Sequence, residues 1–319
     1  MIAAMKGLLY LSRSDVEALL DVDAMLDALA SALAAYSTGV ASAPVRTAVR
    51  VERGLLGVMP GYIPGVALES KLVSVFPAND ERGLPSHQGL IALFDEEEGT
   101  PLAVMDGTYV TAIRTGGTAA VATRVLARED ASVLAILGAG VQGWSHLQAF
   151  PRVRDFDEIR ISSRNFERAS DLAAHHPRAQ AVPAFEDAVR GAHVVACCTD
   201  AREPILRRGW LASGTHVSAV GGTFGPELDP ETVRAARIFV EWRGAVTSAP
   251  PAGAHELQGL DPAQVTEVGE VLAGIKPGRT SNDEITLYKS TGIAVEDAAT
   301  ARLVYDAAVA SGVGTRLPL

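Results

Sequence analysis

Residues 132–143, SVLAILGAGVQG, decide the fold of this chain. The apolar, β-prone run up to Leu137 stops at glycines with Gly-x-Gly-x-x-Gly spacing, and a helix-like segment follows. This order of strand, turn and helix opens a dinucleotide-binding βαβ unit. Gly138 permits the tight turn, Gly140 lets a pyrophosphate approach the backbone, and Gly143 lets the helix pack close to the strand. The helix start then presents free N–H groups to phosphate.

Apolar runs alternate with helical segments from residue 132 onward. The runs lie at 133–137, 158–162, 194–198, 217–220 and 238–240. This alternation predicts a parallel sheet covered by helices. Residues 44–105 instead carry short β-prone runs separated by Pro, Gly and Asn, which is typical of a mostly antiparallel sheet. The predicted fold class is therefore α/β: a Rossmann-type doubly wound parallel sheet plus an N-terminal α+β domain with a mainly antiparallel sheet.

Length, charge and cysteine content exclude several classes of protein. With 319 residues the chain is long for one core, so two domains are expected. A net charge of −10 argues against a general nucleic-acid-binding surface. No apolar window is long enough to span a membrane, and the N-terminus is too short before its first helix for a secretory signal. The only cysteines, Cys197 and Cys198, are adjacent, which suits a reducing, cytoplasmic setting. No spacing suggests a metal site.

The segment after the second predicted parallel strand bears on the choice of nucleotide. An NAD-preferring unit usually carries Asp or Glu about 20 residues past the glycine loop. Here the strand ends in Ser162-Ser163-Arg164-Asn165, which has no carboxylate. Arg164 can pair with a 2′-phosphate, and Ser163 and Asn165 can add hydrogen bonds. Alternatively, Arg164 only begins the next helix and stacks on adenine. The pattern favours NADP(H) over NAD(H).

At this point the chain resembles the ornithine cyclodeaminase/mu-crystallin family over nearly its whole length. Several of the similar blocks are closer to the mu-crystallin/ketimine reductase branch than to true cyclodeaminases. The blocks are Pro44–Thr47, Leu56–Pro60, Ser70–Val73, Ser86–Gln88, Ala103–Gly107, Arg114–Thr115, Gly138–Gln142, Glu203–Leu206, Ala219–Gly221, Glu227–Asp229, Val268–Val271, Lys289–Gly292 and Val295–Asp297.

The resemblance implies a domain arrangement and an assembly. Residues 1–125 would form a substrate-binding and dimerisation domain, joined by a C-terminal helix at about 296–319. Residues 126–295 would form the Rossmann NAD(P)-binding domain. The strands of the first domain would pair two subunits into a homodimer.

Three cations fall in family blocks: Arg46, Lys71 and Arg114. Any one of them alone would more often be a snorkelling surface side chain or a salt-bridge partner. The resemblance implies that they converge. Arg46 and Arg114 would then hold a substrate carboxylate, a task that suits the guanidinium fork. Lys71 would bond that carboxylate or the reacting nitrogen, and neighbouring cations would lower its pKa enough for proton exchange near neutral pH.

One position departs from the cyclodeaminase pattern. Cyclodeaminases, and alanine dehydrogenases of the same family, have Val-Gly-(Gly or Ala)-Asp where this chain has Val220-Gly221-Gly222-Thr223. That Asp serves the amine end of the substrate, and Thr223 cannot ionise to neutralise a terminal ammonium. Glu227 and Asp229 also follow the Asp in the family, so neither is an obvious replacement. This difference favours imine reduction over deaminative cyclisation.

His87 is a further candidate, because histidine exchanges protons near pH 7, although a structural role is at least as plausible. Ser290 and Gly292 lie in a predicted strand or turn, and the resemblance implies that they leave room for the nicotinamide. The whole predicted cofactor-binding set is Gly138, Gly140, Val141, Gln142, Gly143, Ser163, Arg164, Asn165, Thr199, Thr115, Val220, Ser290 and Gly292.

The expected function is NAD(P)H-dependent reduction of a small imino or cyclic ketimine carboxylate by hydride transfer to C=N. The alternative is an ornithine cyclodeaminase, which turns ornithine into proline and ammonia with a recycled hydride. A third hypothesis is a non-enzymatic nucleotide-gated binding protein of crystallin type. The expected partner is a small amino or imino acid.

Overall fold

The computed structural model describes residues 7–222 and 225–318, and it divides into two compact units. Unit 1 comprises the residues up to Arg114 together with those from Ile293 on, and unit 2 is Thr115–Gly292. The first division falls within helix α3 (Gly107–Leu126), earlier than the boundary expected near residue 125. Gly116 and Gly117 directly follow the division, but α3 continues through both, so no loop marks it.

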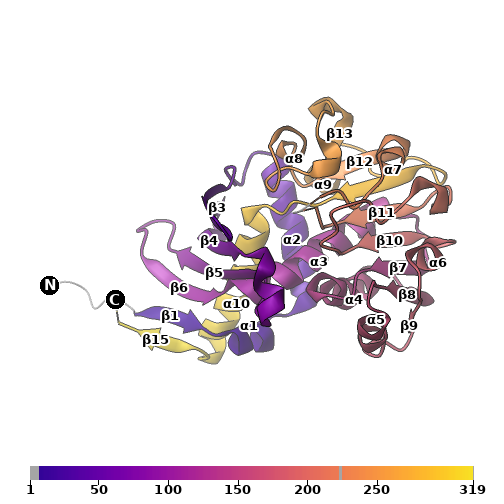
Figure 1. Ribbon diagram of the computed structural model, residues 1–319. Coiled ribbons are helices and arrows are strands. Elements are labelled where there is room, and N and C mark those ends of the chain that lie inside the picture. Colours follow the sequence, from indigo (N-terminus) through magenta and orange to yellow (C-terminus); the bar gives the residue numbers. More distant parts are fainter. Residues whose placement is uncertain (1–6, 223–224, 319) are drawn as a thin grey trace. The chain divides into compact units, whose positions relative to one another are not determined.

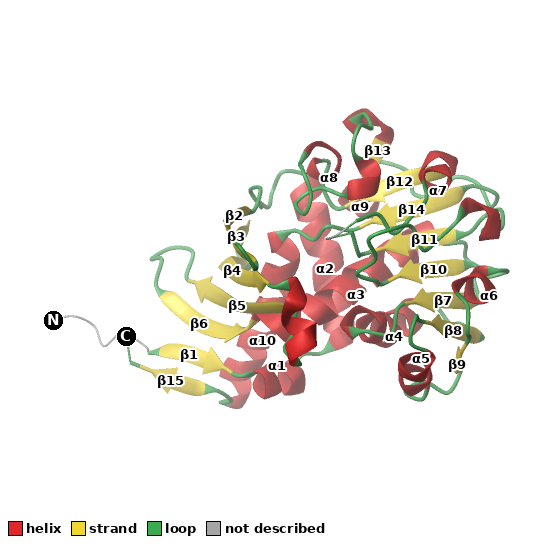
Figure 2. Cartoon of the chain, viewed as in Figure 1, coloured by secondary structure: helices red, strands yellow, loops and turns green. Residues whose placement is uncertain are grey.

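Unit 1 contains a seven-stranded sheet in the order β15-β1-β6-β5-β4-β3-β2. Its neighbours pair antiparallel except β1 with β6, so the sheet is mainly antiparallel, as predicted. Figure 2 shows these strands in yellow. Their bounds are β1 (Leu8–Leu11), β2 (Thr47–Val51), β3 (Gly54–Ile63), β4 (Ala67–Val75), β5 (His87–Phe94), β6 (Pro101–Asp106) and β15 (Thr315–Leu317).

The two faces of this sheet differ because side chains alternate along each strand. One face packs on the C-terminal helix α10 (Ala294–Ser311). Lys71 points to that face, and its partners on the neighbouring strands are Met59 of β3 and Ile91 of β5. The other face carries exposed Leu72 and Leu90, which are paired directly across β4 and β5. The remaining helices of unit 1 are α1 (Arg13–Leu19) and α2 (Val22–Ser37).

Unit 2 contains an eight-stranded parallel sheet in the order β13-β12-β14-β11-β10-β7-β8-β9 (Figure 1). The chain starts at β7, continues outward through β8 and β9, and then returns to β10 on the other side. The strand order therefore reverses between β7 and β10, the point at which open α/β sheets bind ligands. The strands are β7 (Val133–Leu137), β8 (Glu158–Ser162), β9 (Ala179–Ala181), β10 (Val194–Cys197), β11 (His216–Ala219), β12 (Ala236–Val240), β13 (Val265–Glu267) and β14 (Ile285–Lys289).

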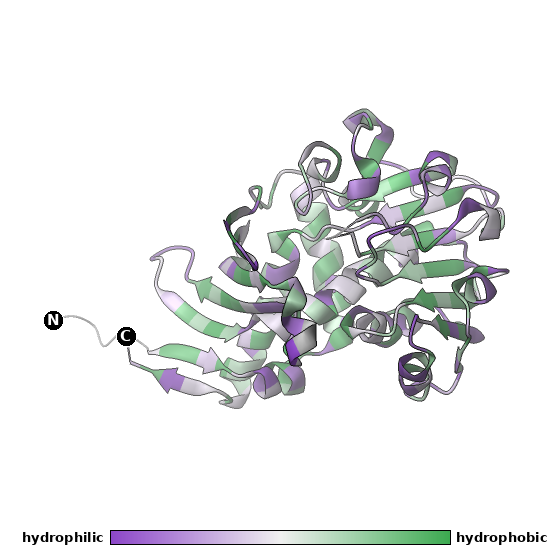
Figure 3. Ribbon diagram, in the orientation of Figure 1, coloured by the Kyte–Doolittle hydropathy of each residue, from purple (hydrophilic) through white to green (hydrophobic). Residues whose placement is uncertain are grey.

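The central strands β7 and β10 are almost wholly buried, and Figure 3 shows them as mostly hydrophobic. Strand β14 is also fully buried, although the sequence pattern did not separate it from the Ser290–Gly292 turn. It lies between β11 and β12, so the last strand of this sheet along the chain enters the interior of the sheet. The helices are α4 (Val141–Val153), α5 (Phe166–Ala173), α6 (Phe185–Val189), α7 (Pro230–Ala235), α8 (Gly244–Thr247) and α9 (Val268–Leu272).

Candidate functional site

The glycine loop follows β7 directly and is shaped by close contacts. Gly138 has a φ of 113°, and a Cβ there would lie 2.5 Å from the carbonyl oxygen of Cys198. A Cβ at Gly143 would lie 2.1 Å from the carbonyl oxygen of Gly138. At Gly140 the same atom would meet nothing in the described residues within 4 Å. Two glycines thus permit tight backbone packing, and the third leaves open space.

Helix α4 begins at this open position, with Gly140 as its N-cap. No side chain among the described residues caps its first turn, and its first residue, Val141, is exposed. The Gln142 side chain accepts a hydrogen bond from Ser145. The first backbone N–H groups of a helix point along its axis and carry partial positive charge. An open N-terminus next to Gly140 fits the pyrophosphate of a dinucleotide.

The residues after β8 lie at the surface. Arg164 forms an exposed ion pair with Asp200, with 3.1 Å between Nη2 and Oδ1. Asn165 caps helix α5 by accepting from the N–H of Arg168, and Ser163 accepts from the N–H of Asn165. Arg164 therefore does more than begin a helix, because its guanidinium reaches the segment that follows β10.

Beneath the carboxyl ends of β10, β11 and β14 lies a buried cluster that sequence reasoning did not predict. Glu227 accepts from the N–H and hydroxyl of Thr199 at 2.8 and 2.7 Å and from the N–H of Gly221 at 2.7 Å. The Lys289 ammonium donates to the Gly221 carbonyl at 2.8 Å and lies 3.2 Å from Glu256. A lysine that ends a buried strand is the sequence signal that could have indicated the cluster.

The other predicted cofactor residues of unit 2 are placed as follows. Thr115 is buried in α3, and Val220 donates its N–H to the Cys197 carbonyl. Ser290 is buried directly after β14, and Gly292 has a φ of 71°. Thr223, predicted as the position where cyclodeaminases carry Asp, lies outside the described residues.

In unit 1, Lys71 of β4 and Arg114 of α3 meet two acids of α10. The Lys71 ammonium donates to Asp297 Oδ2 at 2.6 Å. Arg114 donates from Nε to Asp297 Oδ1 at 2.9 Å and from Nη1 to Glu296 at 2.7 Å. All four side chains are buried. Asp297 therefore holds two cations beside each other, and a substrate carboxylate would share both with the acids of α10.

Burial controls the protonation of this cluster. It lowers the pKa of Lys71 from 10.5 to about 8, with Arg114 and Arg46 adding to the shift and Asp297 opposing it. Burial alone would raise the pKa of Asp297, but Arg114 and Lys71 lower it overall. A lysine with such a pKa can exchange a proton near neutral pH.

The remaining predicted residues of unit 1 lie nearby in the fold. Arg46 precedes β2, is half-buried, and lowers the pKa of Lys71 through its charge. His87 opens β5 on the sheet face that carries Lys71, and its Nδ1 lies 3.1 Å from the Ser86 hydroxyl. Because the charge of Arg46 lowers the pKa of Lys71, Arg46 and Lys71 interact electrostatically.

Glu69 is a second acid of unit 1 that sequence reasoning did not single out. It lies two residues before Lys71, on the same face of β4, and is 2% exposed. Neither of its carboxyl oxygens has a hydrogen-bond partner in the described part of the chain. Burial, followed by the charge of Asp297, raises its pKa well above the ordinary value. A carboxyl group in such a place is held in its neutral form.

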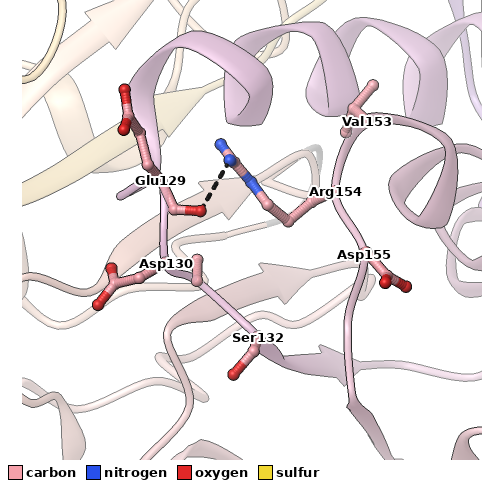
Figure 4. Close-up of a pocket in the computed structure, with 7 residues that line it drawn as sticks. Glu129, Asp130, Ser132, Val153, Arg154 and Asp155 are labelled. Atoms are coloured by element: carbon pink, nitrogen blue, oxygen red, sulfur yellow. Dashed lines mark hydrogen bonds between the residues drawn. The ribbon is translucent and has the colours of Figure 1, made fainter.

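A surface hollow of unit 2 lies away from the glycine loop, at the opposite edge of the parallel sheet (Figure 4). It is lined by Glu129, Asp130, Ala131, Ser132, Val153, Arg154 and Asp155, at the amino ends of β7 and β8. Arg154 donates across it to the Glu129 carbonyl at 3.1 Å. Ligands of open α/β sheets bind at the other edge, so this hollow is not the candidate site.

Among the side chains that the structure describes, no group of three or more His, Cys, Asp or Glu is placed to hold a metal ion. No helix of the described residues is both long and apolar enough to cross a membrane.

Comparison with known proteins assigns the chain to a family. Residues 8–312 match the model of the ornithine cyclodeaminase/mu-crystallin family. The chain belongs to this family. It is 39% identical over 307 residues to ketimine reductase mu-crystallin of Mus musculus, covering 93% of this chain and 96% of that protein. It is 34% identical over 321 residues to alanine dehydrogenase of Archaeoglobus fulgidus, covering 97% and 98%.

A solved structure has the same fold. The Δ1-pyrroline-2-carboxylate reductase of Thermococcus litoralis, solved in complex with NADH and L-proline, superimposes with a TM-score of 0.91. The two are 36% identical, and the match covers 97% of this chain and 100% of that one. The predicted family and the predicted fold class are both confirmed.

Proposed function

We propose that this protein is an NAD(P)H-dependent reductase that transfers hydride to the C=N bond of a small 2-imino or cyclic 2-ketimine carboxylate. The observation that carries the proposal is the pairing of buried Lys71 with Arg114 through Asp297. It puts a proton donor with a pKa of about 8 beside a carboxylate-binding group. The three relatives named above are two reductases and a dehydrogenase, although a lysine cyclodeaminase that is 26% identical has a similar fold as well. The chain is an oxidoreductase that uses a nicotinamide cofactor.

The roles of the residues follow from their chemistry. Arg46 and Arg114 hold the substrate carboxylate, and Lys71 protonates the imine nitrogen, which makes the adjacent carbon electrophilic. The nicotinamide cofactor supplies the hydride. Asp297 keeps Lys71 and Arg114 in place despite their mutual repulsion. Unit 1 is thus the substrate-binding part, and unit 2 binds the cofactor at Gly140 and the start of α4.

For the cofactor we propose a preference for NADP(H), with NAD(H) as the weaker ligand. The support is the segment Ser162–Asn165, which carries Arg164 and no carboxylate. Dissociation constants for NADPH and NADH measure this directly, and tighter binding of NADH would contradict it.

For the assembly and its setting we propose a cytoplasmic homodimer. The outward face of the unit 1 sheet carries exposed apolar side chains on four adjacent strands, which suits burial against a second copy. These side chains are Val49, Val51, Leu56, Leu72 and Leu90. Light scattering after Leu72→Glu with Leu90→Glu should report a monomer. The buried adjacent cysteines suit a reducing compartment.

The experiment that tests the function is a substrate panel. Pyrroline-2-carboxylate and piperideine-2-carboxylate should consume NADPH stoichiometrically, and Lys71→Ala should abolish this turnover while NADPH still binds. Ornithine with oxidised cofactor should give no ammonia. Ammonia release without net cofactor turnover would identify a cyclodeaminase instead. Nicotinamide binding without turnover of any substrate would support a non-enzymatic binding protein.

A further inference from the structure

The carboxyl ends of β10 and β11 are tied together by one buried side chain. Glu227 is fully buried, and its two oxygens accept three hydrogen bonds: two from Thr199 after β10 and one from Gly221 after β11. Each oxygen therefore faces a backbone N–H. A carboxylate satisfies both, whereas an amide would turn its NH2 group toward one of these donors.

The backbone of Glu227 is also held by hydrogen bonds. Its backbone N–H donates to Glu256 at 2.7 Å, and its carbonyl accepts from the N–H groups of Ile205 and Leu206. Lys289 at the end of β14 donates to the Gly221 carbonyl and lies 3.8 Å from the Glu227 carboxylate. The backbone and the carboxylate of Glu227 are thus both held by hydrogen bonds, and Lys289 lies close to the carboxylate.

The contacts of Glu227 continue into the glycine loop. A Cβ at Gly138 would lie 3.1 Å from the Thr199 side chain and 2.5 Å from the Cys198 carbonyl oxygen, so the loop packs directly on the segment that Glu227 holds. Gly221 is equally constrained, because a Cβ there would lie 2.4 Å from the Glu227 carboxyl carbon. These segments flank the point between β7 and β10 at which the strand order reverses.

We infer that Glu227 is a positioning residue for the cofactor: it holds the segments after β10 and β11, and through Thr199 the glycine loop, in the conformation that binds the dinucleotide. The inference rests on the proposed cofactor site of unit 2. Glu227 exerts this role through its hydrogen bonds to Thr199 and Gly221.

The test compares two Glu→Gln variants of unit 2. Glu227→Gln should weaken NADPH binding about tenfold to a hundredfold, the scale on which small misplacements of a site act. Glu267→Gln is the matched control: this acid is also buried and accepts from a backbone N–H, that of Arg243, but lies at the edge strand β13. Both variants should lose thermal stability, and only Glu227→Gln should raise the Kd for NADPH.

A second measurement uses the wild-type chain and needs no variant. On NADPH binding, hydrogen exchange should slow at the amides of Thr199 and Gly221, whereas the amide of Arg243 should not change. Wild-type protein that binds no nicotinamide nucleotide would refute the proposed function. Wild-type binding with an unchanged Kd in folded Glu227→Gln would overturn only the role of Glu227. If that variant does not fold, unchanged exchange at Thr199 and Gly221 would overturn it.

Discussion

Replacing Asp297 by Asn should move the alkaline limb of the pH profile toward neutrality. The Lys71 pKa of about 8 lies well below its ordinary 10.5, which corresponds to a net cost on the order of 3 kcal/mol to hold the proton. Asp297 opposes this shift by its charge and its 2.6 Å hydrogen bond. An adjacent opposite charge shifts a pKa by about 1–3 units, so its removal should bring the Lys71 pKa to about 7 or below.

The assay is kcat/KM for a cyclic ketimine carboxylate as a function of pH. In the wild type the activity should fall as the pH rises through about 8, because Lys71 must carry a proton to donate it. In Asp297→Asn the fall should begin at lower pH. Asp306→Asn is the control, since Asp306 pairs with Arg302 on the same helix at an exposed position. Breaking the buried pair should also cost about 3–5 kcal/mol of stability, so folding is checked by circular dichroism.

Two results would refute this reasoning. A wild-type limb near the ordinary lysine pKa would mean that burial does not control Lys71. An unshifted limb in folded Asp297→Asn would mean that the limb belongs to another group.

Three further predictions concern other buried or paired groups. Burial lowers the pKa of His146 to about 4 and that of His216 to about 3. Urea unfolding should therefore show less stability as pH falls below about 6.5, by up to about 3 kcal/mol for His146, and His146→Asn should reduce the loss. The pKa of Glu69 is raised, so the stability that its neutral carboxyl group contributes is lost as pH rises through that pKa. Glu69→Gln should therefore be more stable than the wild type in alkaline buffer. A less stable variant would contradict this. Asp200→Asn should release Arg164 and favour NADPH over NADH by a few-fold, as suits an exposed pair worth about 0–1 kcal/mol; an unchanged ratio of Kd values would count against a role for Arg164.

Local patterns carried much of the fold. The predicted runs at 133–137 and 158–162 coincide with β7 and β8, because a buried parallel strand is a short apolar run between turns. The apolar residues of α2 (Val22–Ser37) recur at helical spacing, so its sequence alone indicates a helix. The start of α1 is less determined by sequence. Ser12 and Ser14 both precede an acid at capping-box spacing, and the structure shows that Ser12 is the cap.

Part of the candidate site could likewise be predicted from the sequence, and part could not. The glycine loop could be predicted, because its Gly-x-Gly-x-x-Gly spacing between a strand and a helix lies within residues 132–143, although the contact of Gly138 with Cys198 is long-range. The partners of Lys71 and Arg114 could not, because Asp297 lies 226 and 183 residues away from them. The helical spacing of apolar residues shows that Glu296 and Asp297 interrupt an apolar pattern. It does not show which side chains neutralise their charges.

Spacing between residues close in sequence was enough to predict the family, the two kinds of sheet and the position of the dinucleotide loop. The partners of Lys71, the burial of Glu69 and the hydrogen bonds of Glu227 became known from the folded chain, because they join residues far apart in sequence. Burial and long-range charge pairs set a pKa, and both arise only when the chain folds, so they cannot be predicted from local spacing.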